Sequence, residues 1–106
     1  MENSVNAISR SPLPKPHPAV VFRLVADGAV LLHMKSELYF SLNTVGATVW
    51  QNLPPVHEDV DELCATLHAT YPEASAEIVR RDLMALLLQL KANGLVVAAP
   101  DVDSSA

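Results

Sequence analysis

The chain has 106 residues, 50% of them hydrophobic and only 5% aromatic, with a formal net charge of −5. This length suits one domain whose modest core is built mainly from aliphatic side chains. Nucleic-acid-binding proteins gain affinity by neutralising phosphates with lysine and arginine, and this chain has seven such residues. Composition therefore argues against a nucleic-acid partner.

The termini and the single cysteine indicate where the protein works. The N-terminus lacks the basic start and apolar run of a signal peptide, and no window approaches the roughly 18 apolar residues of a membrane span. Cys64 cannot form an internal disulfide, and its apolar neighbours suit a buried structural thiol whose pKa is raised. We expect a cytoplasmic protein without a membrane partner.

Four alternating prolines, the last at Pro18, favour extended chain near the N-terminus and exclude a helix there. The end of the chain is acidic and rich in small residues, so nothing in it drives folding. The sequence therefore predicts a disordered or loosely docked proline-rich arm over residues 1–18, an ordered domain over 19–99 and a flexible acidic tail over 100–106.

Three β-strands follow the arm. Val20–Val25 is rich in β-branched and aromatic residues, and Asp27-Gly28 is a dipeptide that tight hairpin turns prefer. Ala29–Met34 and Leu38–Leu42 are the second and third strands, joined by a turn at Lys35–Glu37. Because these connections are too short for crossovers, we predict an antiparallel meander.

Three helices follow the strands, each with its own capping signal. Asn43-Thr44 caps the first and Pro54-Pro55 stops it, Asp59 opens the second with capping-box spacing, and Ser75 caps the third before Asn93-Gly94 ends it. The predicted ranges are 45–53, 59–71 and 76–92, and a further short strand is expected within Leu95–Ala99.

The last helix carries more apolar surface than one core face requires. Val79, Leu83, Leu86 and Leu90 fall on one line with Leu87 beside it. Met84 and Leu88 point nearly the opposite way, which indicates a second packing surface or a partner.

The third strand has no obvious later strand to cover its edge. On it, Leu38, Phe40 and Leu42 share one face, and Tyr39 and Ser41 share the other. A free edge can bind an extended peptide as an added strand, through main-chain hydrogen bonds and pockets for alternate side chains.

The sequence contains no recognisable catalytic or metal-binding pattern. The four histidines include no pair at the spacing that places two ligands on one helix face, and the three glycines lie too far apart for a phosphate loop. The acidic cluster at Glu58–Glu62 suits a capped, solvated helix start. We predict a protein that is not an enzyme and that uses no cofactor and no metal.

The run ELYFSLNTVGATVW, Glu37–Trp50, resembles the strand-to-helix signature of the PqqD-like family. The resemblance extends over Val20–Val97, through Tyr71, the leucine ladder of the last helix and Gly94-Leu95-Val96. It implies an α+β fold, a winged helix-turn-helix with a three-stranded antiparallel sheet followed by three helices.

The resemblance also implies a function, because family members are recognition elements for ribosomally made, modified peptides (RiPPs). Such an element would capture the leader segment of a precursor as a strand added beside the third strand and packed against the third helix. Arg80 is our addition, as a rim group for an acidic leader residue. The expected peptide-binding residues are Glu37, Leu38, Tyr39, Phe40, Ser41, Leu42, Val79, Arg80, Asp82, Leu83 and Leu86.

Several pathways and partners remain open at this point. A short free-standing chain is most similar to the leader-binding subunit of lasso-peptide systems, which delivers the precursor to a leader peptidase and a cyclase. The alternative is a PqqD-type chaperone that presents a precursor to a radical S-adenosylmethionine enzyme. A winged-helix DNA-binding protein and a homodimer, formed through the free edge or through Met84 and Leu88, complete the hypotheses.

Overall fold

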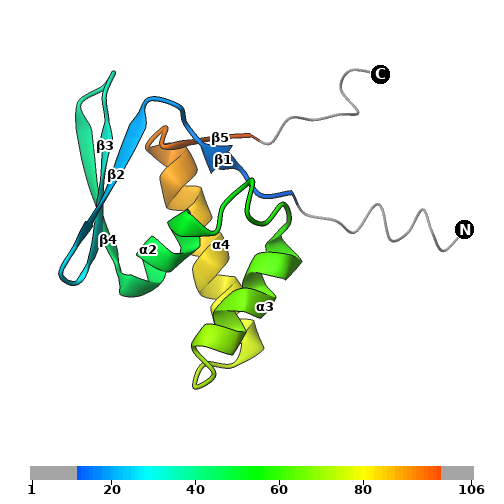
Figure 1. The fold of residues 1–106 in the computed structure, drawn as a ribbon. Coiled ribbons are helices and arrows are strands. Elements are labelled where there is room, and N and C mark those ends of the chain that lie inside the picture. Colours follow the sequence, from blue (N-terminus) through cyan, green and yellow to red (C-terminus); the bar gives the residue numbers. More distant parts are fainter. Residues whose placement is uncertain (1–11, 99–106) are drawn as a thin grey trace, which may run out of the picture.

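A computed structural model describes residues 12–98 as an α+β fold (Figure 1). A three-stranded antiparallel sheet and three helices follow one another along the chain, as predicted, and two very short strands form a second sheet. In chain order the elements are β1 (Lys15–Pro16), β2 (Val20–Val25), β3 (Gly28–His33), β4 (Leu38–Asn43), α2 (Thr44–Gln51), α3 (Val60–Thr70), α4 (Ala76–Ala92) and β5 (Val96–Val97).

The main sheet has the order β2-β3-β4, so β4 is an edge strand. Its register pairs Ala29 with Leu42 and Leu31 with Phe40. Gly28 begins β3 rather than ending the turn before it, and its φ is +151°. A Cβ at this position would overlap the carbonyl oxygen of Leu42. Glycine is therefore required for β3 to approach β4 at this end of the sheet.

Each of the three helices begins directly after the capping residue predicted from the sequence. The side chains of Asn43, Asp59 and Ser75 each accept a hydrogen bond from the backbone N–H three residues later, at 2.8, 2.9 and 3.2 Å. These bonds satisfy N–H groups that the first turn of a helix leaves without intrahelical partners. The helix α2 ends two residues earlier than predicted, at Gln51.

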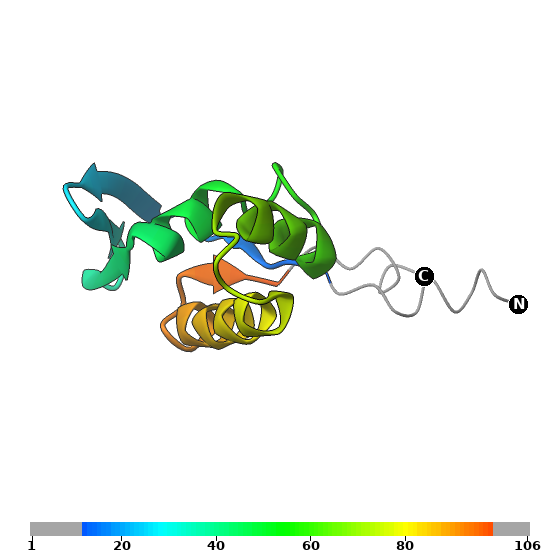
Figure 2. The ribbon, with the colours of Figure 1, turned by 90° about the horizontal axis from the view of Figure 1, so that it is seen from below.

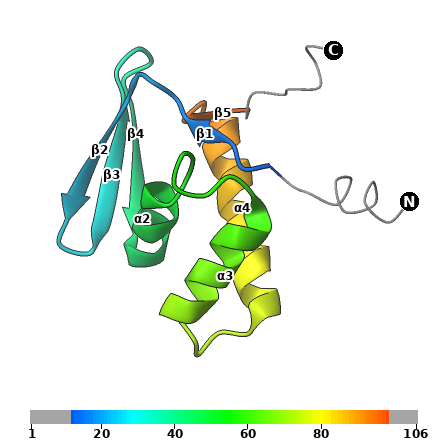
Figure 3. The ribbon, with the colours of Figure 1, turned by 45° about the vertical axis from the view of Figure 1, so that its right-hand side comes forward.

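All three helices lie on one side of the main sheet, with α2 next to the strands and α3 and α4 beyond it (Figures 1 and 3). A view of the molecule from below shows the sheet at one end, beside the helices (Figure 2). The buried core joins these layers and includes Leu31, Leu42, Val49, Trp50, Leu63, Leu67, Val79, Leu83, Leu87 and Leu90.

Helix α4 is rotated slightly from the predicted orientation. Leu87 belongs fully to the core, whereas Leu86 is only partly buried at its margin. Successive residues are about 100° apart around a helix, so the buried residues of α4 share one side, centred near Leu83 and Leu90. Leu86 lies just beyond the edge of that side. As predicted, Met84 and Leu88 lie outside the core, with 41% and 66% of their surfaces exposed.

The predicted arm is wrong for residues 12–18, which pack onto the domain. Leu13 is completely buried, and its backbone N–H donates to the Glu58 carbonyl oxygen at 3.0 Å. Strand β1 pairs antiparallel with β5, Lys15 opposite Val97 (Figure 1). Alternating prolines exclude a helix but not such extended pairing, and Leu13 contributes an apolar anchor.

Because residues 12–18 are packed, the domain begins before residue 19. The predictions of disorder for residues 1–11 and for the tail 100–106 concern residues outside the described range. The predicted last strand is present as β5, and its partner β1 comes from the opposite end of the described chain.

Candidate functional site

A cavity of about 460 Å³ lies between strand β4 and helix α4. We call it the β4–α4 groove. It is lined mostly by apolar side chains, with a few polar groups among them, as is typical of binding sites. The lining residues are Phe40, Ser41, Leu42, Asn43, Val45, Gly46, Val49, Leu67, Tyr71, Ala74, Ile78, Val79, Asp82, Leu83, Ala85, Leu86 and Gln89.

The floor of the groove comes from α2 and from the end of α3. Val45, Gly46 and Val49 of α2 lie along it, and Tyr71 closes it after α3. The hydroxyl of Tyr71 is 3.1 Å from the Thr48 hydroxyl, a hydrogen bond that connects the end of α3 to α2. The floor is therefore fixed by elements that are themselves part of the core.

The outer edge of β4 presents free backbone groups toward this groove. Within residues 12–98, β4 pairs on one side only, with β3. The Met34 N–H donates to the Ala19 carbonyl at 2.9 Å, which fixes the direction of alternate backbone groups along β3. By this alternation Phe40 and Leu42 bond to β3, whereas the N–H and C=O groups of Tyr39 and Ser41 point outward.

The side chains of β4 alternate as predicted. Phe40 and Leu42 face the helices and line the groove, and Leu42 is buried. Tyr39 points to the opposite face of the sheet, where 72% of its surface is exposed. An added strand would continue this alternation, with every second side chain entering the groove.

Helix α4 presents three different faces. One is the core face; a second is exposed and carries Met84 and Leu88; the third faces the groove. The groove face repeats at positions 78, 82, 85 and 89, which is a helical spacing of its own. The family resemblance placed Asp82 at the peptide, but the repeat at 78, 85 and 89 was not recognised from the sequence, because Asp82 and Gln89 interrupt its apolar character.

Seven of the eleven residues predicted from the sequence line the groove together: Phe40, Ser41, Leu42, Val79, Asp82, Leu83 and Leu86. The other four do not. Glu37 lies in the turn before β4 with φ 61°, Leu38 packs against the core, and Tyr39 faces away. Sequence reasoning missed the contributions of α2 and of the end of α3, because nothing local shows which strand those residues will meet.

Arg80 is the fourth residue outside the groove. Its guanidinium pairs with the Asp61 carboxylate of α3, and this hydrogen bond raises the pKa of Arg80 further above its ordinary value. Around the helix, Arg80 lies about 160° from Asp82. The structure therefore does not bring Arg80 to the rim where the sequence analysis placed it.

The arginines of α4 also bear on the DNA-binding alternative. Arg80 pairs with Asp61, and the Arg81 Nε lies 3.5 Å from a carboxylate oxygen of Asp82. A recognition helix directs its cations to phosphates and base edges. Here both arginines of α4 have a carboxylate beside them, whose negative charge repels phosphates, and this disfavours that use.

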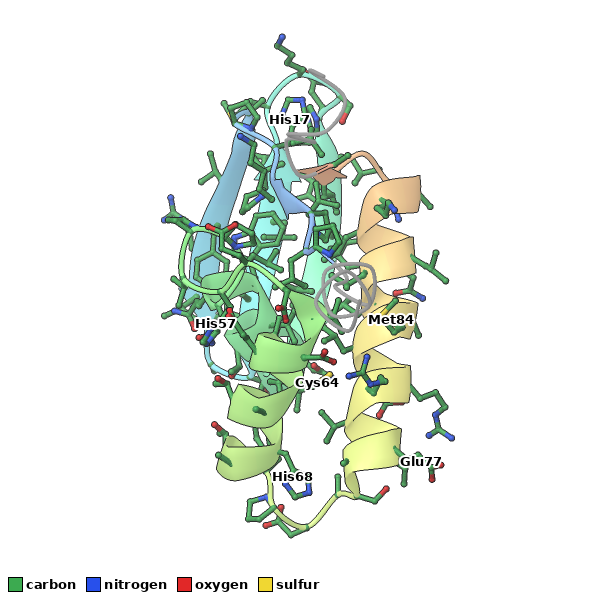
Figure 4. The ribbon with its side chains drawn as sticks, turned by 90° about the vertical axis from the view of Figure 1, so that its right-hand side faces the viewer. His17, His57, Cys64, His68, Glu77 and Met84 are labelled. Atoms are coloured by element: carbon green, nitrogen blue, oxygen red, sulfur yellow. The ribbon has the colours of Figure 1, made fainter. Side chains whose placement is uncertain are left out.

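Cys64 belongs to α3 and lies on the side of that helix next to α4 (Figure 4). Partial burial raises the pKa of its thiol, and the positive charge of Arg80 offsets only part of this shift. The side chain is thus a neutral thiol at neutral pH, as expected for a packing residue. Residues 12–98 hold no group of three or more His, Cys, Asp or Glu placed to bind a metal ion. No helix in the same range is both long and apolar enough to cross a membrane.

These observations define a small α+β domain in which an open strand edge faces a helix across an apolar groove. The family model for coenzyme PQQ synthesis protein D (PqqD) matches residues 28–96, and the chain belongs to this family. Comparison with curated proteins gives no significant match.

Two solved structures share the fold. One is TbiB1 in complex with the TbiA(beta) leader peptide; it is 31% identical, has a TM-score of 0.72, and the match covers 82% of this chain and 99% of that chain. The other is a lasso peptide synthetase B1 complexed with the leader peptide. That chain is 29% identical with a TM-score of 0.70, over 78% of this chain and 95% of that chain.

Proposed function

We propose that this protein is a non-catalytic chaperone that binds the leader segment of a ribosomally made precursor peptide by strand addition at β4. The observation that carries the proposal is the open edge of β4 beside the β4–α4 groove. Two relatives of the same fold, solved with leader peptides bound, support it.

The binding mode follows from the backbone directions of β4. A docked peptide exchanges hydrogen bonds with the outward N–H and C=O groups of Tyr39 and Ser41. Its alternate side chains enter the groove between Phe40 and the α4 wall that includes Leu86. Main-chain bonds thus give affinity for any extended peptide, and the groove selects among sequences.

The proposed partners after capture are the leader peptidase and the cyclase of a lasso-peptide pathway, in the cytoplasm where the precursor is made. The similarity to a lasso peptide synthetase B1 favours this pathway. The alternative inferred from the sequence, presentation of a precursor to a radical S-adenosylmethionine enzyme, is compatible with the match to the PqqD family. The genes beside this one distinguish the two: a peptidase and an asparagine-synthetase-like cyclase indicate a lasso peptide, and a radical enzyme indicates the alternative.

Direct binding tests the proposal. A fluorescent TbiA(beta) leader peptide and the leader encoded beside this gene are titrated with the full chain, and polarisation is measured. We expect a dissociation constant of about 1 μM or lower for the encoded leader, equivalent to about −8.2 kcal/mol. A scrambled peptide of the same composition is the control. Equal binding of the scrambled peptide, or no binding of either leader, contradicts the proposal.

A homodimer joined through β4 uses the same backbone groups as the peptide. The two states therefore compete, and a leader peptide in excess dissociates such a dimer. Sedimentation velocity with and without peptide distinguishes them.

Arg80→Ala should leave leader binding nearly unchanged. The side chain pairs with Asp61 away from the groove, and 49% of it is exposed. Because exposed ion pairs contribute little, we expect the dissociation constant to change by less than about twofold in the polarisation titration. A loss of about tenfold would place Arg80 at the peptide after all, as the rim group inferred from the sequence.

A further inference from the structure

The groove contains one charge. Among the described residues that line it, Asp82 is the single ionisable acid or base other than Tyr71; the rest are apolar, amide or hydroxyl side chains. Because 66% of the Asp82 side chain is exposed, packing within the domain does not explain why a carboxylate stands at this wall of the groove.

Asp82 is only weakly engaged within the domain. Within residues 12–98 its one ion pair is with Arg81, its neighbour in the chain, at 3.5 Å, and 73% of the Arg81 side chain is exposed. Arg81 itself does not line the groove. The carboxylate is therefore available on the groove side of α4, one turn from Ile78 and from Leu86.

We propose that Asp82 selects a basic side chain in the bound peptide. The inference rests on the proposed function, because it assumes that a peptide strand occupies the β4–α4 groove. A docked peptide removes water from the α4 wall, and a carboxylate that loses water without gaining a partner is costly. A lysine or arginine at the groove-facing position opposite Asp82 compensates for this loss, and an acidic residue there is repelled.

The proposal defines a class of ligand. Side chains of an added strand alternate, so the groove contacts every second residue of the peptide. Most of these positions meet apolar side chains such as Phe40, Val49 and Ile78, and one meets Asp82. The preferred ligand is thus an extended peptide with apolar residues at alternate positions and one lysine or arginine in the same alternating series.

A random dodecapeptide library displayed on phage tests this preference and does not require the sequence of the leader. The library is selected on the wild-type chain, on Asp82→Asn and on Glu77→Gln. Glu77 is the matched control, because its replacement removes one negative charge from the same helix outside the groove lining (Figure 4). The control separates a local contact from the general attraction of a chain with net charge −5 for cations.

We expect selection on the wild type and on Glu77→Gln to enrich peptides with an alternating apolar pattern and a basic residue at one fixed position. Selection on Asp82→Asn should enrich the same apolar pattern without the basic residue. Asp82→Arg should enrich an acidic residue at the same place. For a selected peptide, replacing the basic residue by methionine should weaken polarisation-measured binding by about threefold to tenfold to the wild type and leave binding to Asp82→Asn unchanged.

Different outcomes contradict the inference about Asp82 and the proposed peptide-binding function. If no variant enriches any peptide, strand addition itself is contradicted and the inference fails with it. Suppose instead that apolar alternating peptides are enriched. The role of Asp82 is then overturned, and the proposed function stands, if the wild type shows no preference for a basic residue, if Asp82→Asn keeps that preference, or if Glu77→Gln loses it.

Discussion

Replacing Ser41 with proline should weaken leader binding by about tenfold to a hundredfold while the domain stays folded. The Ser41 N–H points to the open edge, so proline removes a bond to the peptide and none to β3. A peptide carbonyl left without its partner in the bound state costs about 1–3 kcal/mol, which gives this range. Polarisation titration measures binding, and circular dichroism on heating measures the fold.

The sheet offers a matched control on its other edge. The same alternation along β2 directs the N–H of Leu24 outward, away from β3. Leu24→Pro therefore also removes an outward N–H from an edge strand, where proline is tolerated, but far from the groove. It should bind like the wild type, and Ser41→Ala, which keeps the N–H, should do the same. Full binding by Ser41→Pro, or equal loss in Leu24→Pro, would contradict strand addition at β4.

Replacing Leu13 with alanine should lower the free energy of unfolding by about 2–5 kcal/mol, the usual cost of emptying a fully buried leucine site. Leu13 has no exposed surface and anchors the segment that carries β1 across to β5. Urea denaturation followed by circular dichroism measures the change. The effect is large because this one side chain fixes the whole N-terminal segment of the described domain.

Leu24→Ala provides the comparison for that experiment, since it is the same substitution at a leucine with 60% of its surface exposed. We expect it to change the free energy of unfolding by no more than about 0.5–1 kcal/mol. Equal stability of Leu13→Ala and the wild type would show that residues 12–18 are not packed, in agreement with the arm inferred from the sequence.

Local signals in the sequence were sufficient for most of the fold. The capping side chains of Asp59 and Ser75 act on N–H groups three residues away, so helix starts were predictable without tertiary information. Alternation along β4 likewise predicted which side chains face the helices. These features depend on neighbours in the chain, which a sequence contains.

Pairing between distant segments was not predictable in the same way. Strand β1 consists of two residues that pair with β5, and the buried Leu13 stands alone among prolines without any periodic pattern. A single apolar residue carries no period-2 or helical signal. Its backbone partner, the Glu58 carbonyl, lies 45 residues further along the chain and comes next to Leu13 only in the folded domain.

The candidate site shows the same division. The strand edge at Ser41 and the core residues of α4 were identified from the sequence and its family resemblance, but the groove floor at Val45 and Tyr71 was not. Ile78 and Gln89 carried a usable signal, because they repeat with Asp82 at helical spacing on the groove face of α4. The pairing of Arg80 with Asp61 was not visible in the sequence, because Asp61 lies on another helix.

Backbone amide exchange followed by nuclear magnetic resonance tests the central claim most directly. Titration of the full chain with its leader peptide should slow hydrogen exchange at Tyr39 and Ser41, whose N–H groups point outward from β4. The amide of Phe40, already bonded to β3, should change little, and that of Leu24 on the opposite edge should stay fast. Peptide binding that leaves Tyr39 and Ser41 fast, or that protects Leu24 instead, would contradict capture of the peptide at β4.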